Sequence, residues 1–371
     1  MTNVIINSIS LLSQKTGIGR YTYEISKSLE KEKKFSLNYY YAYYSKNLID
    51  ISDNSNLKSL KSILAKNSFI KKVVRKLLLL SSQFFSKTYD LYWEPNFIPV
   101  DGIKADKIIT SVHDFSFILY KDFHPKERIE YFENNFFKNI YRSDMIICFS
   151  EFTRQEILER LDFKEEQVKV IYHGIDHNFF NVRDDLKICF ELPQKFIFSV
   201  GSIEPRKNLL GLLEAYNRLS SNIKSKYHLV LAGFKGWNND EIMAIIEQNK
   251  EYIHYLGYVS DDELVKVYNL AMLFVYPSFY EGFGLPVLEA MACGTPVICS
   301  NTSSIPEVGG EAVVYCDPNN VNDIVEKIQI VLNDKKLQQE MIGKGLKRAK
   351  QFTWEKATQE HMKVFEEVLQ N

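Results

Sequence analysis

Short apolar runs alternate along the chain with longer stretches in which apolar positions recur every three to four residues. The runs predict buried strands, and the longer period predicts amphipathic helices. Strands are expected at 4–9, 107–112, 145–149, 168–172, 196–200, 228–232, 253–256, 272–276, 296–299 and 313–315, and a further strand is expected to end within 91–96. Helices are expected at 18–29, 126–141, 209–221, 321–332, 335–351 and 354–369. Two successive β/α series predict an α/β fold with two doubly wound, Rossmann-like domains facing a central cleft.

A glycine-rich turn joins the predicted strand at 272–276 to a helix. Pro286 stands where a first helical residue would, with φ preset and no N–H to leave unpaired. Gly282 and Gly284 allow the backbone to approach a ligand closely, and the free N–H groups of a helix start attract anions. This turn is therefore a candidate phosphate-binding site.

Two carboxylates, Glu281 and Glu289, flank the same turn. A carboxylate only accepts hydrogen bonds, so a pair of them suits a ligand rich in hydroxyl groups. Phosphate-binding N–H groups next to hydroxyl acceptors describe a site for a sugar nucleotide. The alternatives are that Glu289 is a first-turn acid favoured by the helix dipole, and that Glu281 is an ordinary loop acid.

Arg206 and Lys207 follow the strand predicted at 196–200 and precede a helix. The helix dipole disfavours cations at this position, so an anion should compensate them. A diphosphate would do so, because arginine binds phosphate oxygens in bidentate fashion and lysine adds a compact charge. The alternative is a pair of solvated surface charges.

Two turns of the first half carry further candidates. Gly17 and Gly19 are two glycines of a dinucleotide fingerprint, but Thr22 occupies the third position, so a tight turn explains the spacing as well as a ligand loop does. His113 and Asp114 end a predicted strand, and in open α/β sheets ligands bind outside the carboxyl ends of strands. A structural histidine is the alternative there.

Composition narrows the class of protein. The net charge of −1 over 371 residues gives no sign of a nucleic-acid partner. Five scattered cysteines without a Cys-x-x-Cys pair predict reduced thiols and no zinc site. The sequence has no signal-peptide layout and no run of 18 apolar residues, so a cytoplasmic protein is expected. Because no Asp-x-Asp occurs either, we expect no metal and no other cofactor.

Residues 58–87 contain eight lysines and arginines and no acid, interleaved with leucine and phenylalanine. A basic amphipathic helix of this kind can lie on an anionic membrane surface, which would make the protein peripheral to the membrane. The alternative is a helix whose apolar face packs on the domain while its lysines are solvated.

The spacing of Glu281 and Glu289 resembles the Glu-x7-Glu signature of the family-four retaining glycosyltransferases, which have the GT-B architecture. The stretches 200–208 and 295–308 extend this resemblance, which covers nearly the whole chain. It implies an acceptor-binding domain at 1–178, a nucleotide-sugar-binding domain at 179–350 and a last helix at 351–371 that crosses back to the first domain.

The resemblance also implies roles for individual residues. Glu289 would bind the ribose diol, Glu281 a hydroxyl of the transferred sugar, and His113 the sugar near its O6. Catalytic roles fall to His113, Glu281, Arg206 and Lys207; donor binding to Gly17, Gly19, Gly257, Tyr258, Val259, Gly282, Phe283, Gly284, Leu285 and Glu289; and acceptor binding to Arg20, Tyr21 and Asp114. The leaving phosphate oxygen would take the acceptor's proton, without a metal.

The segments 16–21, 113–115 and 150–153 look most like those of bacterial surface-polysaccharide mannosyltransferases. This implies transfer of mannose from GDP-mannose to a growing, lipid-linked oligosaccharide. Alternatives are a UDP- or dTDP-sugar donor, a sugar phosphorylase or epimerase, and a non-catalytic sugar-binding protein. The broken fingerprint at Thr22 argues against a nicotinamide dehydrogenase, and the lack of a carboxylate pair placed as acid and nucleophile argues against a hydrolase.

Overall fold

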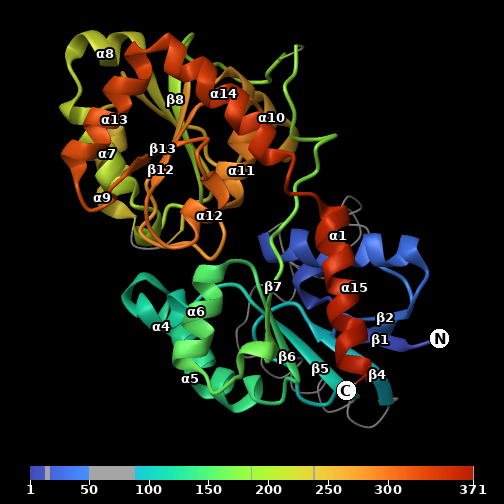
Figure 1. Ribbon diagram of the computed structural model, residues 1–371. Coiled ribbons are helices and arrows are strands. Elements are labelled where there is room, and N and C mark those ends of the chain that lie inside the picture. The colour runs from blue at the N-terminus through green and yellow to red at the C-terminus, as the bar shows by residue number, and fades with distance from the viewer. Residues whose placement is uncertain (13–16, 50–87, 185, 237–238, 371) are drawn as a thin grey trace.

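The computed structural model describes residues 1–12, 17–49, 88–184, 186–236 and 239–370, and it has two α/β domains stacked on each other (Figure 1). The basic stretch at 58–87 lies outside these residues. Among the described helices, none is both long and apolar enough to cross a lipid bilayer.

The N-terminal domain is built on a seven-stranded sheet with the order β3-β2-β1-β4-β5-β6-β7. All neighbours are parallel except β2 and β3. The strands are β1 (Asn3–Asn7), β2 (Ser36–Tyr40), β3 (Tyr44–Ser45), β4 (Thr88–Glu94), β5 (Lys104–Val112), β6 (Met145–Cys148) and β7 (Val168–Val170). The helices are α1 (Gly17–Glu32), α4 (Ser116–Leu119), α5 (Lys126–Ile140) and α6 (Glu151–Arg160), with short 3₁₀ turns η1 (Ile9–Leu12), η2 (Lys121–Phe123) and η3 (Glu165–Gln167).

The C-terminal domain has a fully parallel six-stranded sheet with the order β10-β9-β8-β11-β12-β13. Its strands are β8 (Phe196–Val200), β9 (His228–Ala232), β10 (Ile253–Tyr255), β11 (Leu273–Tyr276), β12 (Val297–Ser300) and β13 (Val314–Cys316). Its helices are η4 (Pro205–Lys207), α7 (Leu209–Arg218), α8 (Ser221–Lys226), α9 (Asp240–Gln248), α10 (Asp261–Leu270), α11 (Leu285–Ala292), α12 (Ile305–Gly309), α13 (Val321–Asn333) and α14 (Lys335–Ala349). The strand order reverses between β8 and β11, and ligands of doubly wound sheets bind at such a switch point.

The predicted elements are confirmed with small shifts at their ends. The strands β8 and β9 have the predicted bounds, and four successive residues are buried in each of them. The strand predicted to reach Ile9 ends at Asn7, and Ile9 begins the 3₁₀ turn. The helix predicted to end at residue 221 stops at Arg218, because the side chain of Ser220 caps a new helix, α8, which the prediction missed.

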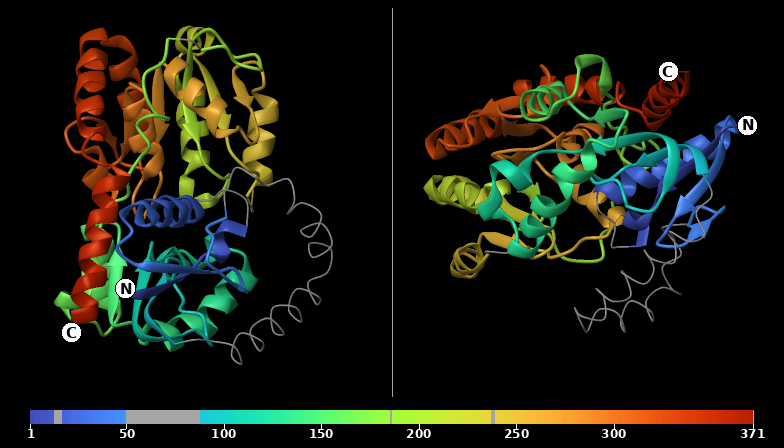
Figure 2. Two further views of the ribbon diagram at one scale, coloured as in Figure 1. Left: turned by 90° about the vertical axis from the view of Figure 1, so that its right-hand side faces the viewer. Right: turned by 90° about the horizontal axis from the view of Figure 1, so that it is seen from below.

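The last helix, α15 (Trp354–Gln370), lies against the N-terminal domain, beside α1 (Figures 1 and 2). The chain crosses between the domains where Ile175 and Thr353 form an isolated bridge. Gly174 has no room for a side chain there, since a Cβ atom would lie 2.2 Å from the backbone nitrogen of Trp354. An ion pair of 2.6 Å between Lys169 and Glu367 holds α15 on the first domain.

Candidate functional site

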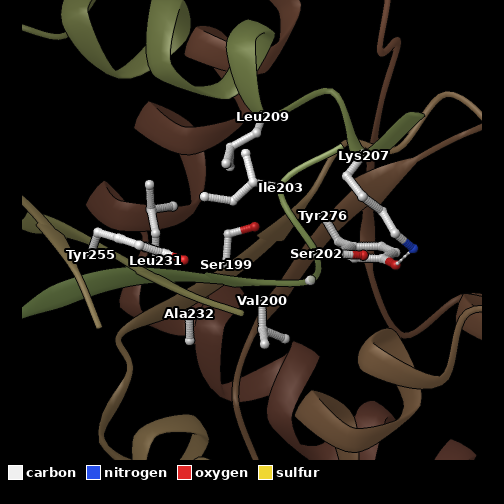
Figure 3. A pocket seen from close by; sticks show the side chains of 11 residues that line it. Ser199, Val200, Ser202, Ile203, Lys207, Leu209, Leu231, Ala232, Tyr255 and Tyr276 are labelled. Atoms are coloured by element: carbon white, nitrogen blue, oxygen red, sulfur yellow. Dashed lines mark hydrogen bonds between the residues drawn. The ribbon is translucent and has the colours of Figure 1, made fainter. Parts of the chain in front are cut away.

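The turns that follow β8 and β11 meet at the switch point of the C-terminal sheet and border a pocket (Figure 3). Lys207 and Tyr276 lie together at one side of this pocket, with 2.8 Å between the lysine Nζ and the tyrosine hydroxyl. The pocket is lined by Ser199, Val200, Gly201, Ser202, Ile203, Lys207, Leu209, Leu231, Ala232, Tyr255 and Tyr276. It therefore opens where a doubly wound sheet binds its ligand.

Glu281 is the centre of a buried ionic cluster at this pocket. Its Oε2 accepts from Arg206 Nη1 at 2.9 Å, and its Oε1 accepts from Lys207 Nζ at 2.7 Å and from the Tyr276 hydroxyl at 2.8 Å. Burial by itself raises the pKa of Glu281, but the charges of Arg206 and Lys207 outweigh it and lower this pKa to about 2. Glu281 is therefore ionised at any working pH.

Arg206 and Lys207 lie in η4, and Asn208 separates them from the first residue of α7. They therefore precede the start of this helix. Glu204 accepts from Arg206 Nη2 at 2.9 Å, and Glu281 pairs with both cations. The compensating anions in this structure are thus protein carboxylates. The sequence predicted an anion beside Arg206 and Lys207. It did not predict that Glu281 would be this anion, because Glu281 lies 75 residues after Arg206.

The glycine-rich turn is held from behind by the loop that follows β12. Ser304 Oγ lies 2.8 Å from the carbonyl oxygen of Glu281, and Ser303 Oγ accepts from the Glu281 N–H at 3.0 Å. Gly284 caps α11 with a φ of +118°, a conformation that favours glycine, and Pro286 is the second helical residue rather than the first. The helix α11 therefore begins four residues after Glu281, and the N–H groups of Val287 and Leu288 bond to the carbonyl oxygen of Gly284.

Glu289 lies on α11, at the boundary between the domains. Its Oε1 accepts from Arg20 Nη1 at 3.2 Å, and its Oε2 accepts from the Tyr268 hydroxyl at 3.1 Å. Burial raises the pKa of Glu289 to about 7, although Arg20 and Tyr268 act against this increase. The guanidinium of Arg20 lies over the Phe180 ring and pairs with Glu289, the residue predicted to bind the ribose. The predicted contact of Arg20 with the acceptor stays a prediction.

Tyr21 is corrected, since its side chain is 1% exposed and lies inside the N-terminal domain. Its hydroxyl is 3.0 Å from Ser111 Oγ and 2.6 Å from His361 Nε2 on α15. Tyr21, Ile25 and Leu29 follow each other at intervals of four along α1, so helical periodicity could have placed Tyr21 in the core. We assign it to holding α15 in place.

His113 and Asp114 lie at the end of β5 and face the glycine-rich turn of the other domain. His113 Nε2 lies 2.8 Å from the carbonyl oxygen of Pro95, and burial lowers the pKa of His113 to about 4, so its ring is neutral. A Cβ atom added to Gly282 would lie 1.8 Å from the carbonyl oxygen of His113. The two segments are thus in backbone contact, as their predicted roles require.

The other residues predicted to bind the donor lie at the start of α1, in the glycine-rich turn and after β10. At the first residue of α1, an added Cβ on Gly17 would lie 3.9 Å from Leu285, so this glycine faces the donor turn, whereas Gly19 is buried in α1. The ring of Phe283 packs in the core at 5.1 Å from the His173 ring, so the predicted donor contact of this residue would be made by its backbone. Beyond β10, Gly257 has a φ of +69°, Tyr258 stacks on Phe234 at 4.5 Å, and Val259 is half-buried.

Several polar residues of this site were not predicted. They are Glu204, Tyr268, Tyr276, Ser303 and Ser304, with Tyr280 and Glu156 at the domain boundary. Glu204 pairs with Arg206, two residues along the chain, whereas each of the others bonds to a residue distant in sequence, which local patterns do not reveal. Within the described ranges, no three His, Cys, Asp or Glu side chains gather as metal ligands would.

Comparison with known proteins identifies both halves of the chain. Residues 16–179 match the family described as Glycosyltransferase Family 4, and residues 186–348 match Glycosyl transferases group 1. The O-antigen chain mannosyltransferase B of Escherichia coli is 33% identical over 361 residues, which cover 92% of this chain and 94% of that protein. The serotype-specific mannosyltransferase WbdA of Escherichia coli is 31% identical over 285 residues, and there the match covers 74% of this chain but 35% of WbdA.

Solved structures share the fold over the whole chain. Sucrose-phosphate synthase from Thermosynechococcus elongatus has a TM-score of 0.70 at 17% identity and covers 99% of both chains. HepE from Anabaena, solved with UDP and glucose, has a TM-score of 0.67 at 14% identity and covers 99% of this chain and 100% of its own. With two matched halves, the GT-B architecture and a relative aligned over nearly its full length, this chain belongs to glycosyltransferase family 4.

Proposed function

We propose that this enzyme transfers mannose from GDP-mannose, with retention of configuration, to a growing lipid-linked oligosaccharide in cell-surface polysaccharide synthesis. The observation that carries the proposal is the cluster of Arg206, Lys207 and Glu281 beside the glycine-rich turn and opposite His113. The choice of mannose is supported by the mannosyltransferases among its relatives.

In the proposed reaction, the donor diphosphate binds Arg206, Lys207 and the N–H groups at the start of α11. The bond between the sugar C1 and the phosphate oxygen breaks while the acceptor hydroxyl bonds to C1 on the same face. The proton of that hydroxyl moves to the leaving phosphate oxygen. Fixed cations stabilise the negative charge of the departing diphosphate, so we propose that the reaction needs no metal.

Positioning accounts for the rest of the mechanism. Glu281, ionised and held by two cations, accepts a hydrogen bond from a sugar hydroxyl, and the neutral His113 contacts the sugar from the other domain. Glu289 accepts from the ribose hydroxyls. Asp114, whose Oδ1 accepts from the Ser116 N–H at 2.9 Å, faces the acceptor. A lipid-linked acceptor would place the enzyme at the cytoplasmic face of a membrane, where the basic residues 58–87 would contact anionic lipids.

The test is thermal stability with GDP, UDP, dTDP, ADP and NAD in turn, each with a chelator present. A ligand at about 100 times its dissociation constant adds about 2.7 kcal/mol to the free energy of unfolding, which shifts the melting temperature visibly. We expect GDP alone to raise it. A shift with UDP or dTDP would replace mannose by another donor sugar, and a shift only when metal is added would contradict metal-independent transfer.

Gly282→Ala should reduce turnover about a hundredfold, because its methyl group would push the glycine-rich turn away from His113. Steady-state kinetics with the cognate donor measure this effect. Gly343→Ala is the matched control: Gly343 lies in α14, and nothing is within 4 Å of an added Cβ. The control should keep full turnover and gain up to about 1 kcal/mol of stability. Equal activity of both variants would contradict the close contact at Gly282.

Donor affinity should increase between pH 6 and pH 8, because the pKa of Glu289 is about 7 and its ionised form is the better acceptor for ribose hydroxyls. Calorimetric titration with GDP at several pH values measures this change. The Glu289→Gln variant should bind GDP more weakly, and its affinity should not depend on pH. A wild-type affinity independent of pH would remove Glu289 from the ribose site.

The raised pKa of Glu289 also affects folding stability, because folding favours the protonated acid. The stabilising contribution of Glu289 to the free energy of unfolding therefore decreases as pH increases from about 4.5 through 7.

A further inference from the structure

Tyr280 extends from the C-terminal domain into the N-terminal domain, and it is 3% exposed. Its ring lies 5.3 Å from that of Tyr120 and 5.8 Å from that of Phe152. Its hydroxyl accepts from the Phe115 N–H at 2.8 Å and donates to Glu156 Oε2 at 2.5 Å. The hydroxyl is therefore fixed by two partners, both in the other domain.

The two ends of Tyr280 touch the two halves of the catalytic centre. The carbonyl oxygen of Tyr280 accepts from Arg206 Nη1 at 2.8 Å, and the next residue is Glu281. The Tyr280 hydroxyl accepts a hydrogen bond from the N–H of Phe115, and Phe115 directly follows His113 and Asp114. One residue thus joins the cationic cluster of the donor domain to the turn that carries His113.

Apolar packing does not account for this contact. Glu156 is a buried acid on α6, and a buried carboxylate is unfavourable unless it is paired or hydrogen-bonded. Its Oε1 lies 3.6 Å from Arg160 Nη2, and its Oε2 takes the hydroxyl of Tyr280. A phenylalanine at position 280 would fill the same aromatic site but would leave the Phe115 N–H and Glu156 without this partner.

We propose that Tyr280 is a positioning residue: its hydroxyl, oriented by Glu156, sets the turn of His113 and Asp114 against Glu281 when the two domains dock. Turnover then depends on a contact that touches neither donor nor acceptor. This inference rests on the proposed function only in using sugar transfer as a readout.

The first test compares Tyr280→Phe with Tyr216→Phe. Tyr216 is equally buried, and its hydroxyl bonds to the carbonyl oxygen of Tyr227 at 3.0 Å inside the C-terminal domain, away from the domain boundary. We expect Tyr280→Phe to lower kcat about 10- to 100-fold and to leave the Kd of the nucleoside diphosphate within about twofold, because Arg206 and Lys207 are unchanged. Tyr216→Phe should lower the melting temperature and keep kcat.

Glu156 provides a conservative rescue. Glu156→Gln keeps an oxygen that accepts from the Tyr280 hydroxyl, so it should retain most of kcat, whereas Glu156→Ala should lose as much as Tyr280→Phe. Equal kcat for the two tyrosine variants, or a parallel loss of kcat and nucleotide affinity in Tyr280→Phe, would overturn the positioning role.

A second measurement is independent of activity. Hydrogen exchange of the Phe115 amide in the ligand-free protein should be faster in Tyr280→Phe than in the wild-type protein, and unchanged in Tyr216→Phe. Unchanged exchange in Tyr280→Phe would overturn the contact itself. If exchange accelerates as expected but the wild-type protein transfers no sugar from any donor, the contact stands and the proposed function fails.

Discussion

Glu281→Gln should lower kcat by about two to three orders of magnitude, the size of effect seen when one preorganised group of a charge-stabilising site is removed. In the wild-type protein a single carboxylate holds Arg206, Lys207 and the Tyr276 hydroxyl in place. Glutamine has nearly the same shape but no charge, so both buried cations lose their shared partner. Steady-state turnover at saturating donor, with a native circular dichroism spectrum, measures this effect.

Glu204→Gln is the matched control, because Glu204 pairs with Arg206 and leaves the contacts of Glu281 intact. Its loss of turnover should be smaller than that of Glu281→Gln. Full turnover of Glu281→Gln would remove Glu281 from the catalytic centre, and equal losses in the two variants would mean that the net charge around Arg206 matters rather than the position of Glu281.

The same substitution has a pH signature in stability. The pKa of Glu281 is about 2 in the folded protein and about 4.5 when unfolded, a difference that corresponds to roughly 3 kcal/mol. A lowered pKa stabilises the fold above the unfolded value, and this contribution is lost as pH decreases through the folded value. Urea unfolding should show a constant difference between wild type and Glu281→Gln from pH 7 to 5, and a narrowing difference below about pH 4.5.

Local sequence patterns predicted the elements of this fold because burial on both faces of a parallel sheet produces continuous apolar runs. The runs that became β8 and β9 gave both ends of each strand correctly. Helix ends were less well predicted, as at Arg218, because a capping serine and two helices in succession resemble one longer helix.

The residues of the candidate site were singled out by type, but their pairing was not predicted. The sequence singled out Arg206 and Lys207 because cations are unfavourable next to a helix start. It singled out Glu281 because a carboxylate beside the glycine-rich turn suits a ligand with hydroxyl groups. That they neutralise one another depends on the strand order, which brings the ends of β8 and β11 together. No local pattern marks such a contact.

The residues at the domain boundary were the least predictable. The pairing of Arg20 with Glu289 was not predicted and Tyr280 was not singled out, because both depend on how two separately folded domains meet. The membrane contact proposed for residues 58–87 stays a prediction.

Lys207→Met should lower kcat about 100- to 1000-fold and should weaken the binding of the cognate nucleoside diphosphate far more than that of the monophosphate. Lys207 lines the pocket at the switch point, and its Nζ already bonds to Glu281 and Tyr276. A charge-assisted hydrogen bond to the second phosphate is worth about 1.5–3 kcal/mol, or roughly 10- to 150-fold in Kd. The monophosphate lacks that group, so its Kd should stay within about threefold.

Lys250→Met is the control for the change in charge. Lys250 pairs with Glu247 on the surface and precedes β10, so it lies at the amino end of the sheet, opposite the pocket. This variant should bind both nucleotides as the wild-type protein does. Equal weakening of diphosphate and monophosphate binding by Lys207→Met would contradict a phosphate role for Lys207.

Lys207→Met should also destabilise the fold less than Glu281→Gln does. It leaves Glu281 paired with Arg206, whereas Glu281→Gln leaves two buried cations without their shared carboxylate.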